Sequence, residues 1–283
     1  MDKYIQKLNF DFLTNQRVMQ LIAAIDEYRG KWNMIEKREN RYLKELRIIA
    51  IIESIGSSTR IEGATMTDEE IQKLLKDVKI TKFNTRDEQE VIGYYEVLEL
   101  IIDNFSEIRL SENYIKQLHQ LLLKHSNKDE RHRGNYKNLP NKVVATYPTG
   151  EQKTIFAPTE PALVESEMFE LLEWTNLHWK EKTIHPLIVL AVFVYEFLSI
   201  HPFRDGNGRL SRLLTTLFLL RQGFIIEQKT VKAADLSAAF PEISLNTLKK
   251  DLQYLKAEQI ITAIGQGKGT VYVINLNNEN NDK

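Results

Sequence analysis

The sequence predicts a mainly α-helical protein: a large helical domain that carries a β-hairpin, followed by a small C-terminal module. The 283 residues include only 12 glycines and 7 prolines, whereas average usage gives roughly thirty-four of the two together. Apolar residues also recur at three- and four-residue spacing through the first half, which is the helical period. Turn-rich sandwiches, barrels and propellers are therefore excluded.

The composition limits the chemistry. The chain has no cysteine, which excludes a disulfide framework, thiolate metal sites and thiol nucleophiles. A formal net charge of −1 gives no global attraction to nucleic acid or anionic membranes. The longest apolar stretch, 187–200, is too short to span a bilayer, and the first ten residues lack the apolar core of a signal peptide. We therefore expect a cytoplasmic protein without membrane contact.

Helical segments account for most of the chain before residue 225. Thr67 and Ser111 are N-cap residues for two of them, and acidic side chains fill the first turn after Thr67. After helical segments near the N-terminus, we expect helices over 40–55, 68–79, 86–104, 111–125, 161–179, 186–200 and 207–222. Ordinary core packing explains these apolar stripes.

The helical pattern is interrupted between residues 131 and 161. Alternation in 142–146 and 153–156 predicts two short strands around Pro148, Thr149 and Gly150. A lone hairpin is marginal in water, so it either packs on the helices or offers a strand edge to another chain.

The pattern of expected secondary structure changes again after Gly223. We expect helices over 230–240 and 244–257, then strands over 260–264 and 270–274 around a glycine-rich turn. This order resembles a winged helix-turn-helix. The expected divisions are 1–50 as an N-terminal helical segment, 51–226 as the main domain, 227–276 as the winged-helix-like module and 277–283 as a disordered tail.

The C-terminal module is nearly neutral. Residues 228–283 contain seven lysines, six acidic residues and no arginine, whereas a duplex-binding domain usually shows a basic footprint. Docking or dimerisation is favoured, and DNA binding through Lys249, Lys250, Lys256 and Lys268 stays open.

The stretch from His201 to Arg212 carries the candidate chemistry. An apolar helix is expected to end at Ile200, because Pro202 cannot continue it and biases the preceding residue out of the helical region. His201 is then left at a helix end. Its imidazole titrates near neutrality, which makes it a candidate general base or acid.

A glycine-rich loop follows this histidine. Gly206 and Gly208 let backbone N–H groups approach a ligand closely, and the next helix begins at about Asn207. Unpaired N–H groups and the positive end of the helix dipole then meet at one place. The loop is therefore predicted to bind an anion.

Charged side chains refine the expected ligand. Arg209 and Arg212 are three residues apart and are expected on one helix face. Two guanidinium groups suit a polyphosphate better than a single carboxylate. Asp205 would be repelled by a phosphate unless a cation lay between them, which implies Mg²⁺.

The residues His201, Phe203, Asp205, Gly206, Asn207, Gly208, Arg209 and Arg212 together resemble the Fic family motif H-x-F-x-[D/E]-G-N-G-R-x-x-R. The resemblance covers about residues 50 to 225. Most members of that family are helical proteins that transfer AMP from ATP to a hydroxyl group of a target protein. One position departs from many AMP-transferring members, which have Asn where this chain has Thr215, so the base preference is left open.

The resemblance implies a role for each motif residue. His201 would take the proton of the target hydroxyl, and Asp205 would hold Mg²⁺. Gly206, Asn207 and Gly208 would cradle the phosphates, while Arg209 and Arg212 would neutralise them. The hairpin, about 141–156, lies where Fic proteins carry a flap that binds the target by strand addition.

An upstream motif adds regulation. Ser58, Glu62 and Gly63 resemble the family's inhibitory motif [S/T]-x-x-x-E-[G/N], on a helix expected at about 56–63. The four-residue spacing places Ser58 and Glu62 on one helix face. The resemblance implies that Glu62 pairs with Arg209 and blocks productive ATP binding.

The leading interpretation is an autoinhibited protein adenylyltransferase that uses ATP and Mg²⁺ and modifies a Ser, Thr or Tyr hydroxyl. AMP removal assisted by Glu62 is one alternative, and transfer of another nucleotide or of phosphocholine is a second. A third alternative is a winged-helix regulator that only senses nucleotide. Self-modification and a homodimer are also left open.

Overall fold

The computed structural model describes residues 2–33, 41–76, 83–146, 152–224, 231–232, 244–257, 261–264 and 271–274. The chain divides into two compact units. The first unit contains residues 1–35 and 52–226, and the second contains residues 36–51 and 227–283. The motif residues and the candidate inhibitory residues Ser58, Glu62 and Gly63 belong to the first unit.

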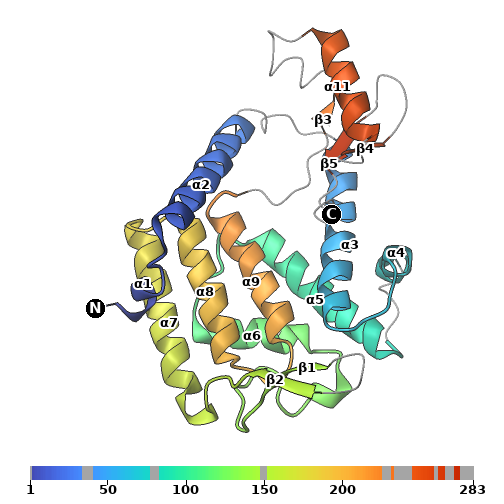
Figure 1. Cartoon of the computed structure of the whole chain (residues 1–283). Coiled ribbons are helices and arrows are strands. Elements are labelled where there is room, and N and C mark those ends of the chain that lie inside the picture. The colour runs from blue at the N-terminus through green and yellow to red at the C-terminus, as the bar shows by residue number, and fades with distance from the viewer. Residues whose placement is uncertain are drawn as a thin grey trace. The chain divides into compact units, whose positions relative to one another are not determined.

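The first unit is built mainly from helices (Figure 1). Those that lie wholly within it are α1 (Lys3–Gln6), α2 (Phe12–Asn33), α4 (Asp68–Lys76), α5 (Arg86–Asn104), α6 (Glu112–Leu122), α7 (Pro161–Glu181), α8 (Pro186–Ile200) and α9 (Asn207–Arg221), with a 3₁₀ turn at Asn127–Asp129. Helix α3 (Arg41–Ile61) contributes its last ten residues to this unit.

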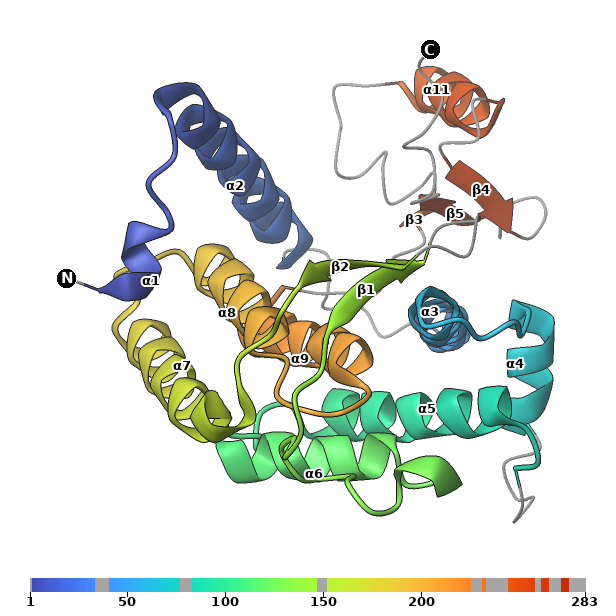
Figure 2. The ribbon, with the colours of Figure 1, turned by 60° about the horizontal axis from the view of Figure 1, so that its bottom comes forward.

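The packing of these helices places α9 in the interior of the unit. Helix α8 packs between α7 and α9, and α9 also packs on α5, which in turn packs on α6 (Figures 1 and 2). Phe193 of α8 contacts Phe218 of α9, with ring centroids 4.9 Å apart. The apolar sequence of α8 allows it to pack against neighbours on two sides. Its last residue is therefore buried.

Local sequence signals fix where several helices begin. Thr85 and Glu88 form a reciprocal capping box at the start of α5, and Thr67 and Glu70 exchange equivalent hydrogen bonds at α4. Ser111 accepts from the N–H of Tyr114 at α6. Such caps satisfy backbone N–H groups that have no partner in the helix. The expected helices between residues 40 and 222 match the observed ones within a few residues, except that α3 continues to Ile61.

A two-stranded antiparallel hairpin interrupts the helices, as the alternation predicted. Strand β1 (Val143–Thr146) pairs with β2 (Gln152–Phe156), and the register is irregular between Val143 and Val144. The predicted turn at residues 148–150 lies outside the described residues. Asn141, two residues before β1, donates from Nδ2 to the carbonyl of Phe203 at 3.3 Å. The hairpin is therefore tied at its base to the loop between α8 and α9 (Figure 2).

The second unit contains helix α11 (Leu245–Ala257) and a three-stranded antiparallel sheet. Its strands are β3 (Val231–Lys232), β4 (Ile261–Ile264) and β5 (Val271–Ile274), in the order β3-β5-β4. The helix expected over 230–240 is wrong at its beginning, because Val231 and Lys232 pair with β5. Pairing with that strand overrode a weak helical pattern at a β-branched residue. Residues 233–243, the glycine-rich turn and the tail after 274 lie outside the described residues, so the winged helix stays a prediction.

Among the described residues, we find no helix that combines the length and the apolar character needed to cross a membrane.

Glycine at position 93 permits the contact between α5 and α6. A Cβ atom added there would lie 2.1 Å from the carbonyl oxygen of Leu122, and a backbone atom cannot move aside as a flexible side chain can. We expect Gly93→Ala to lower the free energy of unfolding by about 1–3 kcal/mol, measured by urea denaturation. Gly30→Ala is the control: that helical glycine has nothing within 4 Å of an added Cβ, so alanine should stabilise by about 0.5–1 kcal/mol. Equal effects at both positions would contradict this account.

Candidate active site

The candidate site is the reversal between α8 and α9. Helix α8 ends at Ile200, where the sequence placed its end, and His201 follows with φ 51° and ψ 60°. This left-handed conformation is uncommon for a residue other than glycine and requires support from its surroundings. The His201 N–H donates to the carbonyl of Phe197 at 2.9 Å. The histidine is thus held at the helix end with its side chain only partly exposed.

The loop is braced from inside by Asn207. Its Oδ1 accepts from the N–H of Phe203 at 2.9 Å, and its Nδ2 donates to the carbonyl of the same residue at 2.7 Å. The Phe203 side chain is fully buried, and Asn207 is 2% exposed. The Asn207 side chain therefore closes the loop on itself.

The environment of His201 favours the neutral imidazole. Burial lowers the pKa of His201 below its usual 6.5, and the nearby positive charge of Lys137 lowers it further. A ring hydrogen bond to the backbone of Leu198 and the charges of Glu62 and Asp205 oppose this shift. A neutral imidazole keeps a lone pair on one ring nitrogen, as a general base at neutral pH requires.

Lys137 is a buried cation beside this histidine, and its chain position gave no signal of that role. Its Nζ donates to the carbonyl of Ile200 at 3.1 Å and to Oδ1 of Asn141 at 2.8 Å. Its backbone N–H donates to the carbonyl of Pro202 at 2.8 Å. The lysine therefore ties the chain before the hairpin to the end of α8, where the helix dipole also favours a cation.

Asp205 is ionised and surrounded by positive charge. One carboxylate oxygen accepts from Nζ of Lys128 at 2.8 Å, and the other accepts from Nη2 of Arg209 at 3.1 Å and from the N–H of Gly206 at 2.6 Å. Burial alone would raise the pKa of Asp205, but these three partners outweigh burial and lower it to about 2. Lys128 was not anticipated, because it lies 77 positions away in the sequence.

The two motif arginines point to different neighbours. Arg209 is 1% exposed and lies between Asp205 and Glu90 of α5, whose Oε2 is 3.4 Å from Nη1. Arg212 instead reaches α3. Its Nε donates to Oγ of Ser58 at 2.6 Å, and its Nη2 donates to Oε1 of Glu62 at 2.7 Å and to the carbonyl of Ser58 at 3.0 Å.

The expected pairing of Glu62 with Arg209 was therefore wrong: Glu62 pairs with Arg212. The reason is that α5 lies beneath the first arginine and supplies Glu90, a buried carboxylate whose other oxygen is bound by Arg86 at 2.7 Å. Only the second arginine faces α3. The two motif arginines were expected to face one ligand from the same helix face. Instead, Arg209 and Arg212 contact different segments of the chain.

Glu62 also lies against the first turn of α9. A Cβ atom added to Gly208 would come within 2.3 Å of Glu62 Oε1, so the carboxylate occupies the space left by the missing side chain. Helix α3 ends at Ile61, and Gly63 follows with φ +96°, a conformation that favours glycine. A carboxylate therefore lies at a helix N-terminus, the place where an anionic ligand is favoured.

The residues present fit a magnesium ion held mainly by its substrate. Within the described ranges, no cluster of three or more His, Asp or Glu side chains could hold a metal alone. Asp205 offers one ionised carboxylate, and Mg²⁺ commonly binds one or two carboxylates together with substrate phosphates and water. Asp205 fits that kind of site, although Lys128 now makes contact with it.

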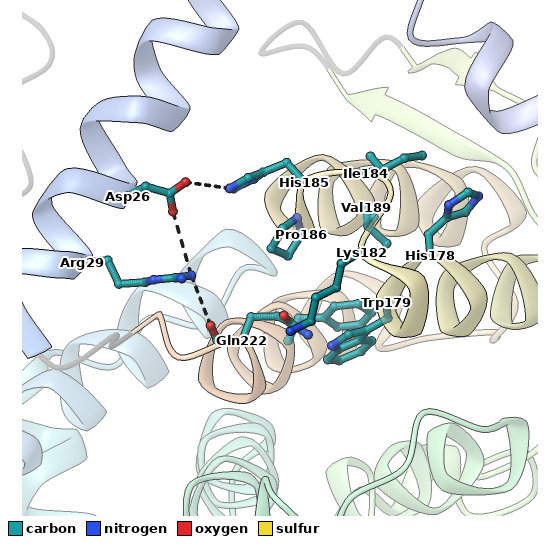
Figure 3. A pocket seen from close by; sticks show the side chains of 11 residues that line it. Asp26, Arg29, His178, Trp179, Lys182, Ile184, His185, Pro186, Val189 and Gln222 are labelled. Atoms are coloured by element: carbon teal, nitrogen blue, oxygen red, sulfur yellow. Dashed lines mark hydrogen bonds and ion pairs between the residues drawn. The ribbon is translucent and has the colours of Figure 1, made fainter.

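A separate pocket lies away from this loop (Figure 3). It has a volume of about 300 Å³, and none of the motif residues lines it. His185 on its wall contacts Asp26 at 3.0 Å and accepts from the N–H of Leu187. That histidine therefore caps α8 and is not placed as the candidate base is.

The fold and the loop define a class of protein: a helical domain in which a histidine, a carboxylate and two arginines surround the N-terminus of one helix. Residues 109–219 match the family model described as Fic/DOC family. This segment of the chain is therefore similar to Fic/DOC family domains.

Curated relatives agree with this assignment. The chain is 29% identical over 231 residues to the Protein adenylyltransferase Fic of Drosophila melanogaster, which covers 78% of this chain and 44% of the relative. It is 25% identical over 243 residues to the Protein adenylyltransferase fic-1 of Caenorhabditis elegans, which covers 78% of this chain and 44% of the relative. The chain spans less than half the length of these relatives.

A solved structure shares the fold. The Fic domain containing signaling protein from Bacteroides thetaiotaomicron aligns with a TM-score of 0.61 and 27% identity, over 82% of this chain and 91% of that one.

The buried pair of Arg209 and Glu90 should be costly to break. We expect Glu90→Ala to lower the free energy of unfolding by about 3 kcal/mol, since it leaves a buried guanidinium short of a partner. Glu96→Ala on the same helix is the control: its carboxylate is 25% exposed and pairs with Lys124 at 3.1 Å, so the loss should stay below about 1 kcal/mol. Urea denaturation of both variants measures the difference, and a loss no larger at Glu90 would contradict a structural role for the pair.

Proposed function

We propose that this chain is a protein adenylyltransferase, which transfers AMP from ATP to a hydroxyl group of a target protein and releases pyrophosphate. The observation that best supports this function is the single loop that brings a neutral His201 and an ionised Asp205 to the N-terminus of α9, with Arg212 one turn further along. The names of the relatives indicate that the transferred group is an adenylyl group. The loop offers groups suited to the phosphates of such a nucleotide.

In the proposed reaction, His201 takes the proton of the target hydroxyl. The hydroxyl oxygen forms a bond to the α-phosphorus of ATP, the bond from that phosphorus to the bridging oxygen breaks, and pyrophosphate leaves. The imidazolium that forms can later release its proton to solvent. Most of the rate enhancement would come from positioning and from stabilising charge on the phosphates.

The phosphates would be bound by backbone and by one guanidinium. The first turn of α9 lies against Glu62 at Gly208, and Arg212 is the arginine that reaches this place. Arg209 is buried against Glu90 and Asp205, so we assign it the positioning of Asp205. When bound, Mg²⁺ would neutralise phosphate charge, and Asp205 would hold it.

The hairpin β1–β2 is the proposed binding place for the target. Strand addition to its edge would align a target segment through main-chain hydrogen bonds. Asn141 and Lys137 connect the base of the hairpin to the loop, which would place the target hydroxyl near His201. Thr215 supports no base preference, because its hydroxyl donates within its own helix to the carbonyl of Ser211 at 2.9 Å.

We also propose that the chain inhibits itself. Glu62 and Ser58 occupy Arg212, and the Glu62 carboxylate takes the place of an anion at the N-terminus of α9. A guanidinium engaged in this way is withheld from the γ-phosphate of ATP. Removal of the carboxylate should free both the arginine and the helix N-terminus.

Labelled ATP tests this proposal. We expect label from the α-phosphate on protein, weak with the wild type, stronger by tenfold or more with Glu62→Gly, and absent with Glu62→Gly/His201→Ala. Label from the γ-phosphate should not be transferred. Glu62→Gln is the matched control, since it keeps the side-chain volume but not the charge, and should lie between the wild type and Glu62→Gly.

The alternatives give different results in the same experiment. Transfer from the γ-phosphate would overturn the proposal. Binding of ATP without covalent label in any variant would indicate a nucleotide sensor, and loss of AMP from a pre-labelled protein, dependent on Glu62, would indicate AMP removal.

The lowered pKa of His201 predicts the acid limit of the reaction. Because the base must be neutral, the rate should fall as the pH drops through a pKa that lies below 6.5. Lys137 contributes to this lowering, whereas Glu62 and Asp205 oppose it. Lys137→Met should therefore raise the pKa of His201 and move the acid limb to higher pH, as measured from the pH dependence of α-label transfer.

Lys137→Arg serves as the control, because it keeps the positive charge and should leave the limb in place. A limb that does not move in Lys137→Met, or that moves equally in both variants, would contradict electrostatic tuning by this lysine.

A further inference from the structure

A second histidine lies directly against the candidate loop. His119 of α6 is fully buried, and its ring stacks on Phe203 with centroids 3.7 Å apart and an interplanar angle of 11°. Its Nε2 is 2.9 Å from the backbone carbonyl oxygen of Asp205. Helix α6 brings this histidine to the loop although it lies 86 residues away in the sequence.

The hydrogen bonds of His119 fix its tautomer. The backbone N–H of Gly134 donates to Nδ1 at 2.8 Å, so Nδ1 must carry a lone pair. An imidazolium carries a proton on both ring nitrogens, so a ring that accepts at Nδ1 is neutral. A neutral imidazole has one N–H, so Nε2 carries the proton and donates it to the Asp205 carbonyl.

This donated hydrogen bond fixes the peptide unit between Asp205 and Gly206. The carbonyl and the N–H of a trans peptide point in opposite directions, so holding the carbonyl on His119 directs the Gly206 N–H to the other side. There it donates to the Asp205 carboxylate at 2.6 Å. Gly206 has φ +80° and could turn without this restraint.

We propose that His119 is a positioning residue for the nucleotide site: its Nε2–H orients the Asp205–Gly206 peptide and, through that peptide, the Asp205 carboxylate. The stacked ring of His119 also holds Phe203 at the beginning of the loop. One side chain therefore restrains the loop both at Phe203 and at the Asp205–Gly206 peptide. The inference rests on the proposed function only in taking the loop as the place where nucleotide binds.

Two amide substitutions separate this role from simple packing. In His119→Gln the side-chain NH₂ can take the place of Nε2–H, whereas in His119→Asn the amide oxygen can take the place of Nδ1 and no donor reaches the loop. Both variants lose the stacked ring. A purely structural histidine would make them lose affinity and stability alike.

The test is made in the full-length Glu62→Gly chain, which frees the N-terminus of α9. Binding of α,β-methylene-ATP with Mg²⁺ is measured by calorimetry at a temperature below the thermal midpoint of every variant. We expect His119→Asn to bind about tenfold more weakly, which corresponds to one hydrogen bond, and His119→Gln to stay within about threefold. Equal affinities, or stronger loss in His119→Gln, would overturn the proposal.

A spectroscopic measurement tests the tautomer without any variant. Long-range ¹H–¹⁵N correlation spectra of the wild-type chain should show His119 as the neutral Nε2–H form, and a protonated Nδ1 would overturn the proposal. Neither measurement needs AMP transfer. A chain that fails to label any protein would therefore count against the proposed function but leave the result on His119 intact.

Discussion

The sharp reversal of the chain between α8 and α9 is the constraint on which the candidate site depends. Six residues, 201–206, must turn from one buried helix into the next, with His201 in a left-handed conformation and Gly206 at a positive φ. Hydrogen bonds stabilise this turn. Asn207 binds both the backbone N–H and the carbonyl of Phe203, and Lys137 donates to the carbonyl of the last residue of α8. Chemistry and fold therefore share the same few residues.

Opposite charges alternate through the layers around this turn. Glu90 lies beneath Arg209, Arg209 supports Asp205, and Asp205 faces Lys128. Toward α3, Arg212 faces Glu62. In this partly buried site the neighbouring cations keep the Asp205 carboxylate ionised, and each guanidinium is directed by its carboxylate partner. The loop is thus preorganised for the phosphates that we propose it binds.

Sequence reasoning succeeded where the determinants are local. The end of α8 and the loop after it were predicted from Pro202 and from the glycines at 206 and 208. The beginnings of two helices were predicted from Thr67 and Ser111. Sequence reasoning failed where a contact depends on a segment that is distant in the sequence. Glu90 and Lys128 reach the motif from other elements, and the pairing of Glu62 with Arg212 depends on which helix lies beside each arginine. At Val231 a partner strand, 40 residues later, overrode the local pattern.

The absence of a side chain at Gly208 has a consequence for how the protein can change. The same space accommodates the Glu62 carboxylate and lies at the helix N-terminus proposed for phosphate, so a larger residue there would expel the inhibitor and obstruct the substrate together. Under the proposed self-inhibition, a larger residue on the α9 side therefore cannot raise activity. A change that relieves this inhibition must arise on α3 or in the turn after it, where the carboxylate can be removed and the proposed anion site left intact.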